Sequence, residues 1–238
     1  MYLNLKRLQL KPKSRNLKLM KATDGLHAFL WTSMSANNCN TYLIDGPAKI
    51  LIDPGHFHLF DHVAIQLRDI KIEISDIDLV LVTHAHPDHF EAAKHFKNQP
   101  ALLAMSPEDW RMIREIAKYV GPAFDVDAYT PDFFLGPGSL NAKGVELKVI
   151  PSPGHAPGSV ALYWPERKAL FTGDVVFRDG LGRTDLPGGN GAILKQSIKE
   201  LQSLDAEWLL PGHGEIIQGG AKVKSNFRRV EEFWFNYI

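Results

Sequence analysis

Short runs of apolar residues alternate along the chain with longer amphipathic stretches. The short runs, bounded by Gly and Asp turns, are typical of β-strands. The predicted strands are residues 26–31, 40–45, 49–53, 79–84, 102–105, 145–150, 160–164, 169–172 and 208–210. The longer stretches repeat their apolar residues with the period of a helix. The predicted helices are residues 59–70, 89–96, 107–120, 192–204 and 221–236.

The order of these elements predicts one α/β domain over residues 1–238. The early part is rich in strands and βα units follow, so we expect stacked mixed β-sheets with helices outside. A basic lead-in, residues 1–22, is expected to form a solvated edge strand or arm. Residues 214–238 are expected to form a C-terminal helix, docked on the core or in a homodimer contact. Residues 121–138, rich in Pro, Gly and Phe, are expected to form a functional lid or packed surface.

The composition is that of an ordinary globular protein. Hydrophobic residues make up 45% of the 238 residues and charged residues 23%, which excludes a disordered or collagen-like chain. Lys and Arg number 27, as do Asp and Glu, so no nucleic-acid partner is expected. No apolar run reaches the roughly 20 residues of a membrane span, and basic residues interrupt every candidate signal sequence. The single Cys39 cannot form an internal disulfide, which fits a reducing compartment. Together these features lead us to expect a cytoplasmic protein without a membrane partner.

Four potential metal ligands follow the apolar run that ends before Thr83. His84, His86, Asp88 and His89 form the pattern H-x-H-x-D-H. Packed together, these imidazoles would repel one another when protonated and leave lone pairs unsatisfied when neutral. A divalent cation removes this conflict, because neutral imidazole and carboxylate are among its usual ligands. The pattern therefore predicts part of a metal site.

Three further candidate ligands lie downstream, each directly after a glycine at the end of an apolar run: His155, Asp174 and His213. Loops at strand ends are where folds commonly carry reactive groups, and glycine lets the backbone bend tightly there. A single Gly-His or Gly-Asp pair is weak evidence. Three such pairs behind the first motif predict one site built from distant parts of the chain.

Seven ligands are too many for one tetrahedral ion, so we predict two divalent ions. Asp174 is the expected bridge, because a carboxylate has two oxygens to share. The other ligands form two trios: His84, His86 and His155 for one ion, and Asp88, His89 and His213 for the other. A water between the ions would be deprotonated near neutral pH and act as the nucleophile, with Asp88 as a catalytic residue that helps to hold it. Zinc is the first expectation, and iron and manganese suit the same ligands.

The order of H-x-H-x-D-H, Gly-His, Gly-Asp and Gly-His resembles that of the metallo-β-lactamase-fold superfamily, from about residue 26 to His213. The resemblance implies a four-layer αββα sandwich with the metal site at one edge between the sheets. In the stretch LIDPG, Asp53 would orient a metal-bound His. Asp174 stands where many true β-lactamases carry Cys, and residues 182–189 read GRTDLPGG. Both features are similar to the glyoxalase II-like hydrolase branch.

This branch implies hydrolysis of a small-molecule thioester, lactone or related ester. An alternative is a persulfide dioxygenase with a single iron on His84, His155 and Asp174, a set with open coordination positions. Phosphodiesterase or nuclease activity on the same scaffold is a further alternative, as is a non-catalytic metal-binding module. The substrate itself is left open, because its determinants would lie in variable loops such as residues 121–138.

The roles of several other polar residues stay open. Arg183 would pair with Asp185 or meet an anionic substrate. His56 directly follows Asp-Pro-Gly and would reach the substrate pocket if it turned inward. The simpler expectation for His56, together with His58 and His62, is a helix start at the surface. Cys39 is expected to be a small buried residue rather than a nucleophile.

Overall fold

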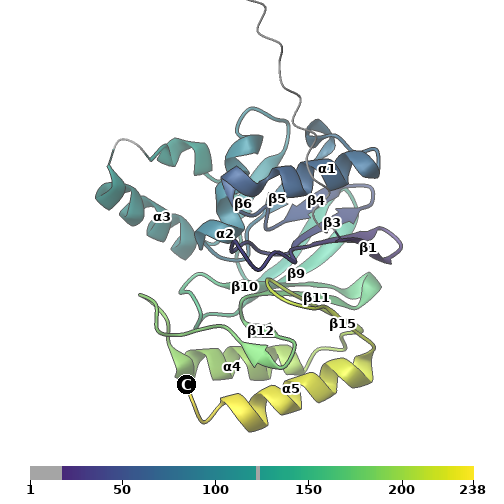
Figure 1. Ribbon diagram of the computed structural model, residues 1–238, viewed down its shortest axis with the longest axis vertical. Coiled ribbons are helices and arrows are strands. Elements are labelled where there is room, and N and C mark those ends of the chain that lie inside the picture. Colours follow the sequence, from purple (N-terminus) through teal and green to yellow (C-terminus); the bar gives the residue numbers. More distant parts are fainter. Residues whose placement is uncertain (1–17, 122–123) are drawn as a thin grey trace, which may run out of the picture.

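The computed structural model describes residues 18–121 and 124–238, and it contains two β-sheets that stack face to face (Figure 1). The first sheet has, in spatial order, β1 (Lys18–Thr23), β2 (Leu26–Leu30), β3 (Thr41–Asp45), β4 (Lys49–Ile52), β5 (Leu79–Leu81), β6 (Leu102–Met105) and β7 (Phe133–Phe134). The second sheet has the order β15 (Ile217–Gln218), β14 (Trp208–Pro211), β11 (Ala169–Gly173), β10 (Val160–Trp164), β9 (Val145–Pro151) and β8 (Gly138–Ala142). A short hairpin contains β12 (Val176–Phe177) and β13 (Gly180–Leu181).

Helices cover the outer face of each sheet, which gives four layers (Figure 1). The helices on the first sheet are α1 (Asp61–Asp69), α2 (Pro87–Phe90) and α3 (Pro107–Val120). The helices on the second sheet are α4 (Gly191–Gln202) and α5 (Gly220–Trp234). Five 3-10 turns complete the described elements: η1 (Phe57–Leu59), η2 (Ile74–Asp76), η3 (Glu91–Phe96), η4 (Val126–Tyr129) and η5 (Pro165–Arg167). The predicted four-layer αββα fold is confirmed.

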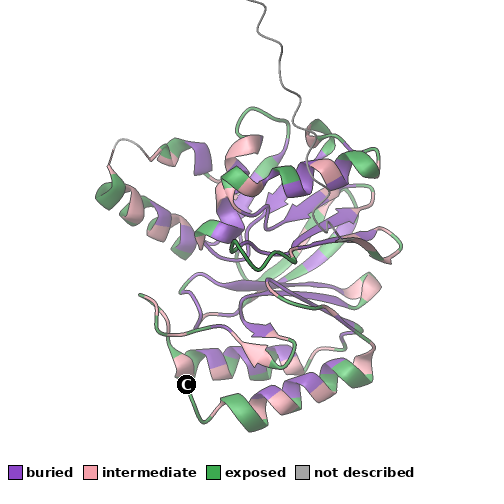
Figure 2. Ribbon diagram, in the orientation of Figure 1, coloured by how far each residue is buried: buried purple, intermediate pink, exposed green. Residues whose placement is uncertain are grey.

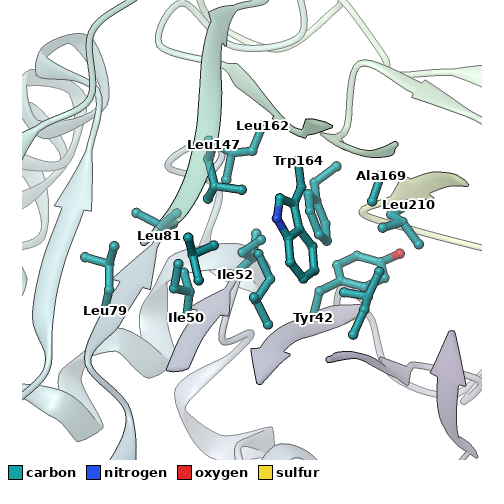
Figure 3. Close-up of a cluster of buried hydrophobic side chains, with 14 of the residues drawn as sticks. Tyr42, Ile50, Ile52, Leu79, Leu81, Leu147, Leu162, Trp164, Ala169 and Leu210 are labelled. Atoms are coloured by element: carbon teal, nitrogen blue, oxygen red, sulfur yellow. The ribbon is translucent and has the colours of Figure 1, made fainter. Parts of the chain in front are cut away.

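Buried residues are concentrated on the strands of both sheets and on parts of the helices that cover them (Figure 2). Between the two sheets, Ile50 and Ile52 of β4 belong to one cluster with Leu162 and Trp164 of β10 (Figure 3). Leu51 belongs to a different cluster, between the first sheet and its helices, because successive strand residues face opposite sides. Strands that are buried on both faces lack polar alternation, which is why they appear in the sequence as short continuous apolar runs.

The predicted strands and helices are present with ends shifted by a few residues, except near the first histidine motif. The bounds predicted for helix 89–96 are wrong. Helix α2 begins at Pro87 with His86 as its N-cap, and the 3-10 turn η3 continues the chain from Glu91. Proline is favoured at the first helical position because its φ is already that of a helix and it has no N–H to satisfy. The earlier start puts Asp88 and His89 inside the first helical turn.

The strand predicted over residues 79–84 ends at Leu81. Thr83 leaves the sheet because its N–H donates to Asp53 Oδ1 at 2.8 Å, and its carbonyl accepts from Val160 N at 2.9 Å. Val160 begins β10 of the second sheet, so this bond joins the two sheets beside the histidine motif. The segment after Thr83 is thereby directed toward the gap between the sheet edges.

Some short strands at sheet edges have no signal in the apolar pattern. β8 carries exposed or half-exposed residues along its whole length, so it produces no apolar run. β1 is the edge strand of the first sheet and contains the end of the basic lead-in; residues 1–17 of that lead-in lie outside the described residues. Among the described residues, no helix combines the length and the apolar character that a bilayer crossing requires.

The surface position expected for His62 is wrong. His62 is 6% exposed on the face of α1 that packs against the first sheet, and its Nε2 lies 3.2 Å from the carbonyl oxygen of Phe29. Burial lowers the pKa of His62. In the segment 121–138, outside residues 122–123, which are not described, Ala128 and Tyr129 are buried against the helical layer of the first sheet. This packing favours the packed-surface interpretation over a lid.

Candidate metal centre

The seven predicted ligands meet at one edge of the two sheets. His84, His86, Asp88 and His89 lie in the turn after β5 and the first turn of α2. The other three follow strands of the second sheet: His155 after β9, Asp174 after β11 and His213 after β14. β11 and β14 are parallel, and β9 runs in the same direction because β10 is antiparallel to both of its neighbours. All three strands therefore deliver their following loops to one edge.

Glycine makes this approach possible. A Cβ at residue 212 would collide with the carboxylate of Asp174 and the ring of His89. A Cβ at residue 173 would collide with the side chain of Thr83, and Gly173 also has a φ of 48°. Any larger residue at either position would push a ligand of the second sheet away from the ligands of the first.

The first group of ligand atoms contains His84, His86 and His155. His86 Nδ1 lies 3.1 Å from His84 Nε2 and 2.9 Å from His155 Nε2. Burial lowers the pKa of all three rings, to about 4 for His86. The rings are thus neutral near pH 7, which is the form that binds a metal ion.

Hydrogen bonds at the far side of two of these rings set their tautomers. The Thr83 hydroxyl donates its one hydrogen to Asp53 Oδ2 at 2.6 Å, so it accepts from His84 Nδ1 at 3.2 Å. His155 Nδ1 donates to the carbonyl oxygen of Arg183 at 2.8 Å. In both neutral rings Nε2 then carries a lone pair that points at His86. His86 Nδ1 has at most one hydrogen, so it cannot satisfy both neighbours, and a cation between the three nitrogens would.

The second group contains Asp88, His89 and His213. His213 Nε2 lies 3.2 Å from Asp88 Oδ2 and 3.3 Å from His89 Nε2. Burial lowers the pKa of His213, but its contacts with Asp174 and Asp88 outweigh burial and raise the pKa to about 9. Burial likewise opposes the charge of His89, yet Asp174 and Asp53 raise the pKa of His89 well above its usual value.

Asp174 lies between the two groups. Its Oδ2 is 3.6 Å from His155 Nε2 of the first group and 3.3 Å from His213 Nε2 of the second. Its Oδ1 is buried and accepts no hydrogen bond from the residues that the structure describes, although His89 Nε2 is 3.3 Å away. Burial raises the pKa of Asp174, but His89 and His213 outweigh it and keep the pKa well below its usual value. Asp174 is therefore an ionised carboxylate with an oxygen available to a cation.

Asp53 connects the ligands of the first sheet from behind. Its Oδ2 accepts from His89 Nδ1 at 2.9 Å and from the Thr83 hydroxyl at 2.6 Å. It lies directly after β4 with a φ of 52°, in the left-handed region that Asp tolerates better than most residues. By holding His89 Nδ1–H, Asp53 leaves His89 Nε2 free to face Asp174 and His213.

These donor sets fit divalent transition-metal ions. Three groups of candidate ligand atoms each lie within 4.8 Å of one another: His84, His86 and His155; His84, His89 and Asp174; and Asp88, His89 and His213. Nitrogen atoms 2.9–3.3 Å apart are close to the spacing expected around a tetrahedral ion with bonds of about 2.0–2.1 Å. The carboxylates stay ionised. Burial raises the pKa of Asp88, but the contacts with His213 and His89 outweigh burial and lower that pKa below its usual value. Imidazole and carboxylate together suit zinc, iron and manganese.

The other predicted residues lie around this centre or away from it. Arg183 makes a two-armed ion pair with Asp185, with Nε and Nη2 each 2.7 Å from a carboxylate oxygen. His56 turns to Glu91, with Nδ1 2.7 Å from Oε2, and belongs to none of the three groups. Cys39 is buried, and burial raises the pKa of its thiol well above the usual value, as expected of a structural cysteine.

Several residues that support the centre were not predicted. Asn37 Nδ2 donates to Asp88 Oδ2 at 2.7 Å. Asn40 Nδ2 donates to the carbonyl oxygens of Pro211 and Gly214, on both sides of His213. The only signal for them was the polar stretch NNCN before a strand, and nothing in it indicates contact with residues so far along the chain. Arg183 supports His155 through its carbonyl oxygen, which any residue type could supply.

Comparison with known proteins agrees with this geometry. The family model of the metallo-beta-lactamase superfamily matches residues 34–213, a range that contains all seven candidate ligands. The probable metallo-hydrolase MJ0888 of Methanocaldococcus jannaschii is 33% identical over 186 residues, which cover 74% of this chain and 88% of the relative. Hydroxyacylglutathione hydrolase GloC of Haemophilus influenzae is 32% identical over 200 residues, which cover 79% and 91% of the two chains.

A solved structure supports the same comparison. The crystal structure of TTHA1623 in a di-iron-bound form superimposes with a TM-score of 0.67 and 30% identity. The match covers 82% of this chain and 97% of that protein. A protein that is similar over most of the present chain therefore holds two iron ions.

Proposed function

The chain belongs to the metallo-beta-lactamase superfamily, and we propose that it hydrolyses a thioester or a related ester at a centre of two divalent ions. One ion would be held by His84, His86 and His155, the other by Asp88, His89 and His213, and Asp174 would contact both. Family membership supports a metal-dependent hydrolase in general. The count of two ions, the use of Asp174 as the bridge and the substrate class are parts of the proposal.

The observation that carries the proposal is the position of Asp174. Its two oxygens face nitrogen atoms of both ligand groups at 3.3–3.6 Å, and Oδ1 has no hydrogen-bond donor among the described residues. A persulfide dioxygenase needs a single iron held by two His and one carboxylate. Such a site would leave His86, Asp88, His89 and His213 without a ligand role, although the last three form a second compact group. The two-ion interpretation uses all seven.

Divalent ions held by these residues would provide a bound water that is deprotonated near neutral pH, and would polarise the carbonyl oxygen of the substrate. The residues of the chain hold and orient these parts. Asp53 fixes the ring of His89, the Arg183 carbonyl fixes that of His155, and Asn37 fixes the Asp88 carboxylate. Asp88 would help to hold the attacking water beside the ions.

Exposure indicates the side from which a substrate would enter. The side chain of His89 is fully buried, whereas that of His213 is 29% exposed and that of Asp88 is 11% exposed. The centre is therefore closed around His89 and most open beside His213 and the half-buried His86. The thioester carbonyl would approach from this open side.

The substrate class rests on the relatives. GloC, named a hydroxyacylglutathione hydrolase, is 32% identical to this chain over 79% of its length, and TTHA1623 binds two iron ions in its solved structure. The similarity to GloC supports a thioester as the first compound to test, and the similarity to TTHA1623 supports a centre of two ions. Metal identity is part of the proposal only as a choice among zinc, iron and manganese, because the nitrogen and oxygen ligands suit all three.

The experiment that tests the proposal is thioester hydrolysis by the purified chain after loading with zinc, iron(II) or manganese. We expect at least one loaded form to release thiol from a hydroxyacylglutathione, with no oxygen uptake, and the His84→Ala chain to be inactive under the same conditions. Oxygen consumption with glutathione persulfide would instead point to the dioxygenase. Absence of hydrolysis of thioesters, lactones and other esters by every loaded form would contradict the proposal.

A further inference from the structure

We propose that His56, His58 and Glu91 form a separate binding site for a divalent transition-metal ion, outside the centre described above. The proposal concerns metal binding alone and does not depend on the reaction assigned to the main centre. It accounts for a second histidine pair in the sequence, H-x-H at residues 56–58, which the proposed hydrolase function does not use.

The three side chains are close enough to share an ion. One ligand atom from each, two ring nitrogens and a carboxylate oxygen, lies within 4.8 Å of the others. His56 Nδ1 and Glu91 Oε2 are already 2.7 Å apart. The rings of His56 and His58 have their centroids 5.2 Å apart at 43°. Two of the three atoms therefore have the spacing of neighbouring ligands, and a rotation of the exposed His58 ring would complete the set.

The backbone around these residues is held on both sides. His56 N donates to Asn38 Oδ1 at 2.8 Å. Gly55 N donates to the carbonyl oxygen of His89 at 3.2 Å, and Ala92 N donates to that of Gly55 at 2.7 Å. These hydrogen bonds hold the start of η1 against the start of η3. The backbone therefore brings His56 and Glu91 close together.

Aromatic packing strengthens the same junction. The ring of His95 in η3 stacks on Phe57 and on Phe60, with centroids 4.4 Å apart in both cases. Its Nε2 lies 3.2 Å from the carbonyl oxygen of Phe57. His95 is thus a structural histidine of the same junction, and it is absent from the group of candidate ligands. It provides a matched control for the experiment below.

The chemistry of the group selects the type of ion. Two imidazoles and one carboxylate suit zinc and other divalent transition metals better than calcium or magnesium, which prefer oxygen. The His56 and Glu91 side chains are 19% and 29% exposed, and His58 is exposed. An ion can therefore enter from solvent and keep water on its remaining positions. The alternative is that His56 and Glu91 form an ion pair and His58 is an ordinary surface residue.

The site has a structural consequence for the main centre. Gly55 lies two residues after Asp53, and Glu91 lies two residues after His89. An ion on His56, His58 and Glu91 would join the two segments that carry Asp53 and His89, which contact each other at 2.9 Å. We expect the ion to stabilise this junction without being part of the reaction.

The test counts zinc ions by equilibrium dialysis of the chelator-treated full chain. We expect three zinc ions per chain for the unmodified protein and two for His58→Gln and for Glu91→Gln, while the control His95→Gln keeps three. Zinc should also raise the melting temperature of the unmodified chain more than that of His58→Gln. Equal zinc counts in the unmodified, His58→Gln and Glu91→Gln chains would overturn the proposal.

A second background separates this proposal from the proposed function. In a chain that carries His84→Ala and Asp174→Ala, the centre of the proposed hydrolase has lost one ligand of the first group and the bridge between the two groups. If this chain loses one bound zinc ion when His58→Gln is added, the result would support the peripheral site, formed by His56, His58 and Glu91, even if the unmodified chain hydrolysed no ester. Zinc retention that His58→Gln and Glu91→Gln do not change in this background would overturn the peripheral site while leaving the hydrolase proposal intact.

Discussion

The first sheet supplies four candidate ligands from the six positions of residues 84–89, whereas the second supplies three from separate loops. The first set is positioned by local conformation, a turn followed by a helix that begins at Pro87. The second set depends on glycines that allow close approach and on bonds between the sheets, such as that from Tyr42 Oη to the carbonyl oxygen of Pro211 at 2.7 Å. A local motif can thus carry half of a site, but the other half exists only when the two sheets pack correctly.

The largest effect should come from removing a ligand from either half. We expect His84→Ala and Asp174→Ala each to lose bound metal and hydrolysis together, because each removes a group that is proposed to contact the ions directly. Elemental analysis and thioester hydrolysis on the same preparations would measure both. The Asp174→Ala chain should lose more metal than His84→Ala, since Asp174 faces both groups. Unchanged metal content in both variants would contradict the assignment of the two sheets' ligands to one centre.

A second variant tests the dependence of the second half on close packing. Gly212→Ala places a methyl group against Asp174 and His89, so we expect weaker metal binding and a stability loss of about 1–3 kcal/mol. Chemical denaturation and metal titration would measure the two effects. Gly136→Ala is the matched control, because residue 136 has open space around it and no positive φ. Equal stability and equal metal binding in the two variants would mean that the close contact of Gly212 with Asp174 and His89 does not position His213.

A smaller effect should follow from changing the support of the first half. Asp53→Asn keeps the shape but removes the charge that holds His89 Nδ1–H, so we expect metal affinity to fall about 10–100-fold. Competition with a chromophoric chelator would measure it. Arg183→Gln is the control from the second half, because His155 binds the main-chain carbonyl of residue 183, and its affinity should be nearly unchanged. An equal fall in metal affinity in both variants would mean that the Asp53 side chain matters no more to metal binding than the Arg183 side chain.

The two groups should also differ in the protons they release. Low pKa values keep His84, His86 and His155 neutral near pH 7, so an ion displaces nothing from them. The pKa values of His89 and His213 are raised, to about 9 for His213. Both rings therefore carry a second proton in the metal-free chain, and an ion must displace that proton. Metal affinity should therefore rise with pH from 7 through the pKa of His213, about 9. An indicator dye in weak buffer at pH 7 should report proton release that falls in His213→Gln, and identical release would contradict this difference.

The same comparison explains how much the sequence could predict. The motif of residues 84–89 and the three glycine-linked ligands were predicted because their spacing and flanking glycines are visible in one dimension. The contacts of Asn37 with Asp88 and of Asn40 with the His213 loop were not, because they join residues far apart in the chain. Apolar runs likewise predicted the central strands, whereas the exposed edge strand β8 left no such pattern. The burial of His62 depends on which face of α1 packs against the sheet. His62 follows other polar residues in the sequence, so the sequence did not reveal which face that is.

The central claim is that side chains from both sheets share two ions across Asp174. Anomalous diffraction from crystals of the zinc-loaded protein, recorded on both sides of the zinc absorption edge, tests it most directly. The account predicts two strong peaks at the sheet edge, one among His84, His86 and His155 and one among Asp88, His89 and His213, with Asp174 oxygens beside both. A single peak, or none, among these seven side chains in fully loaded crystals would contradict it.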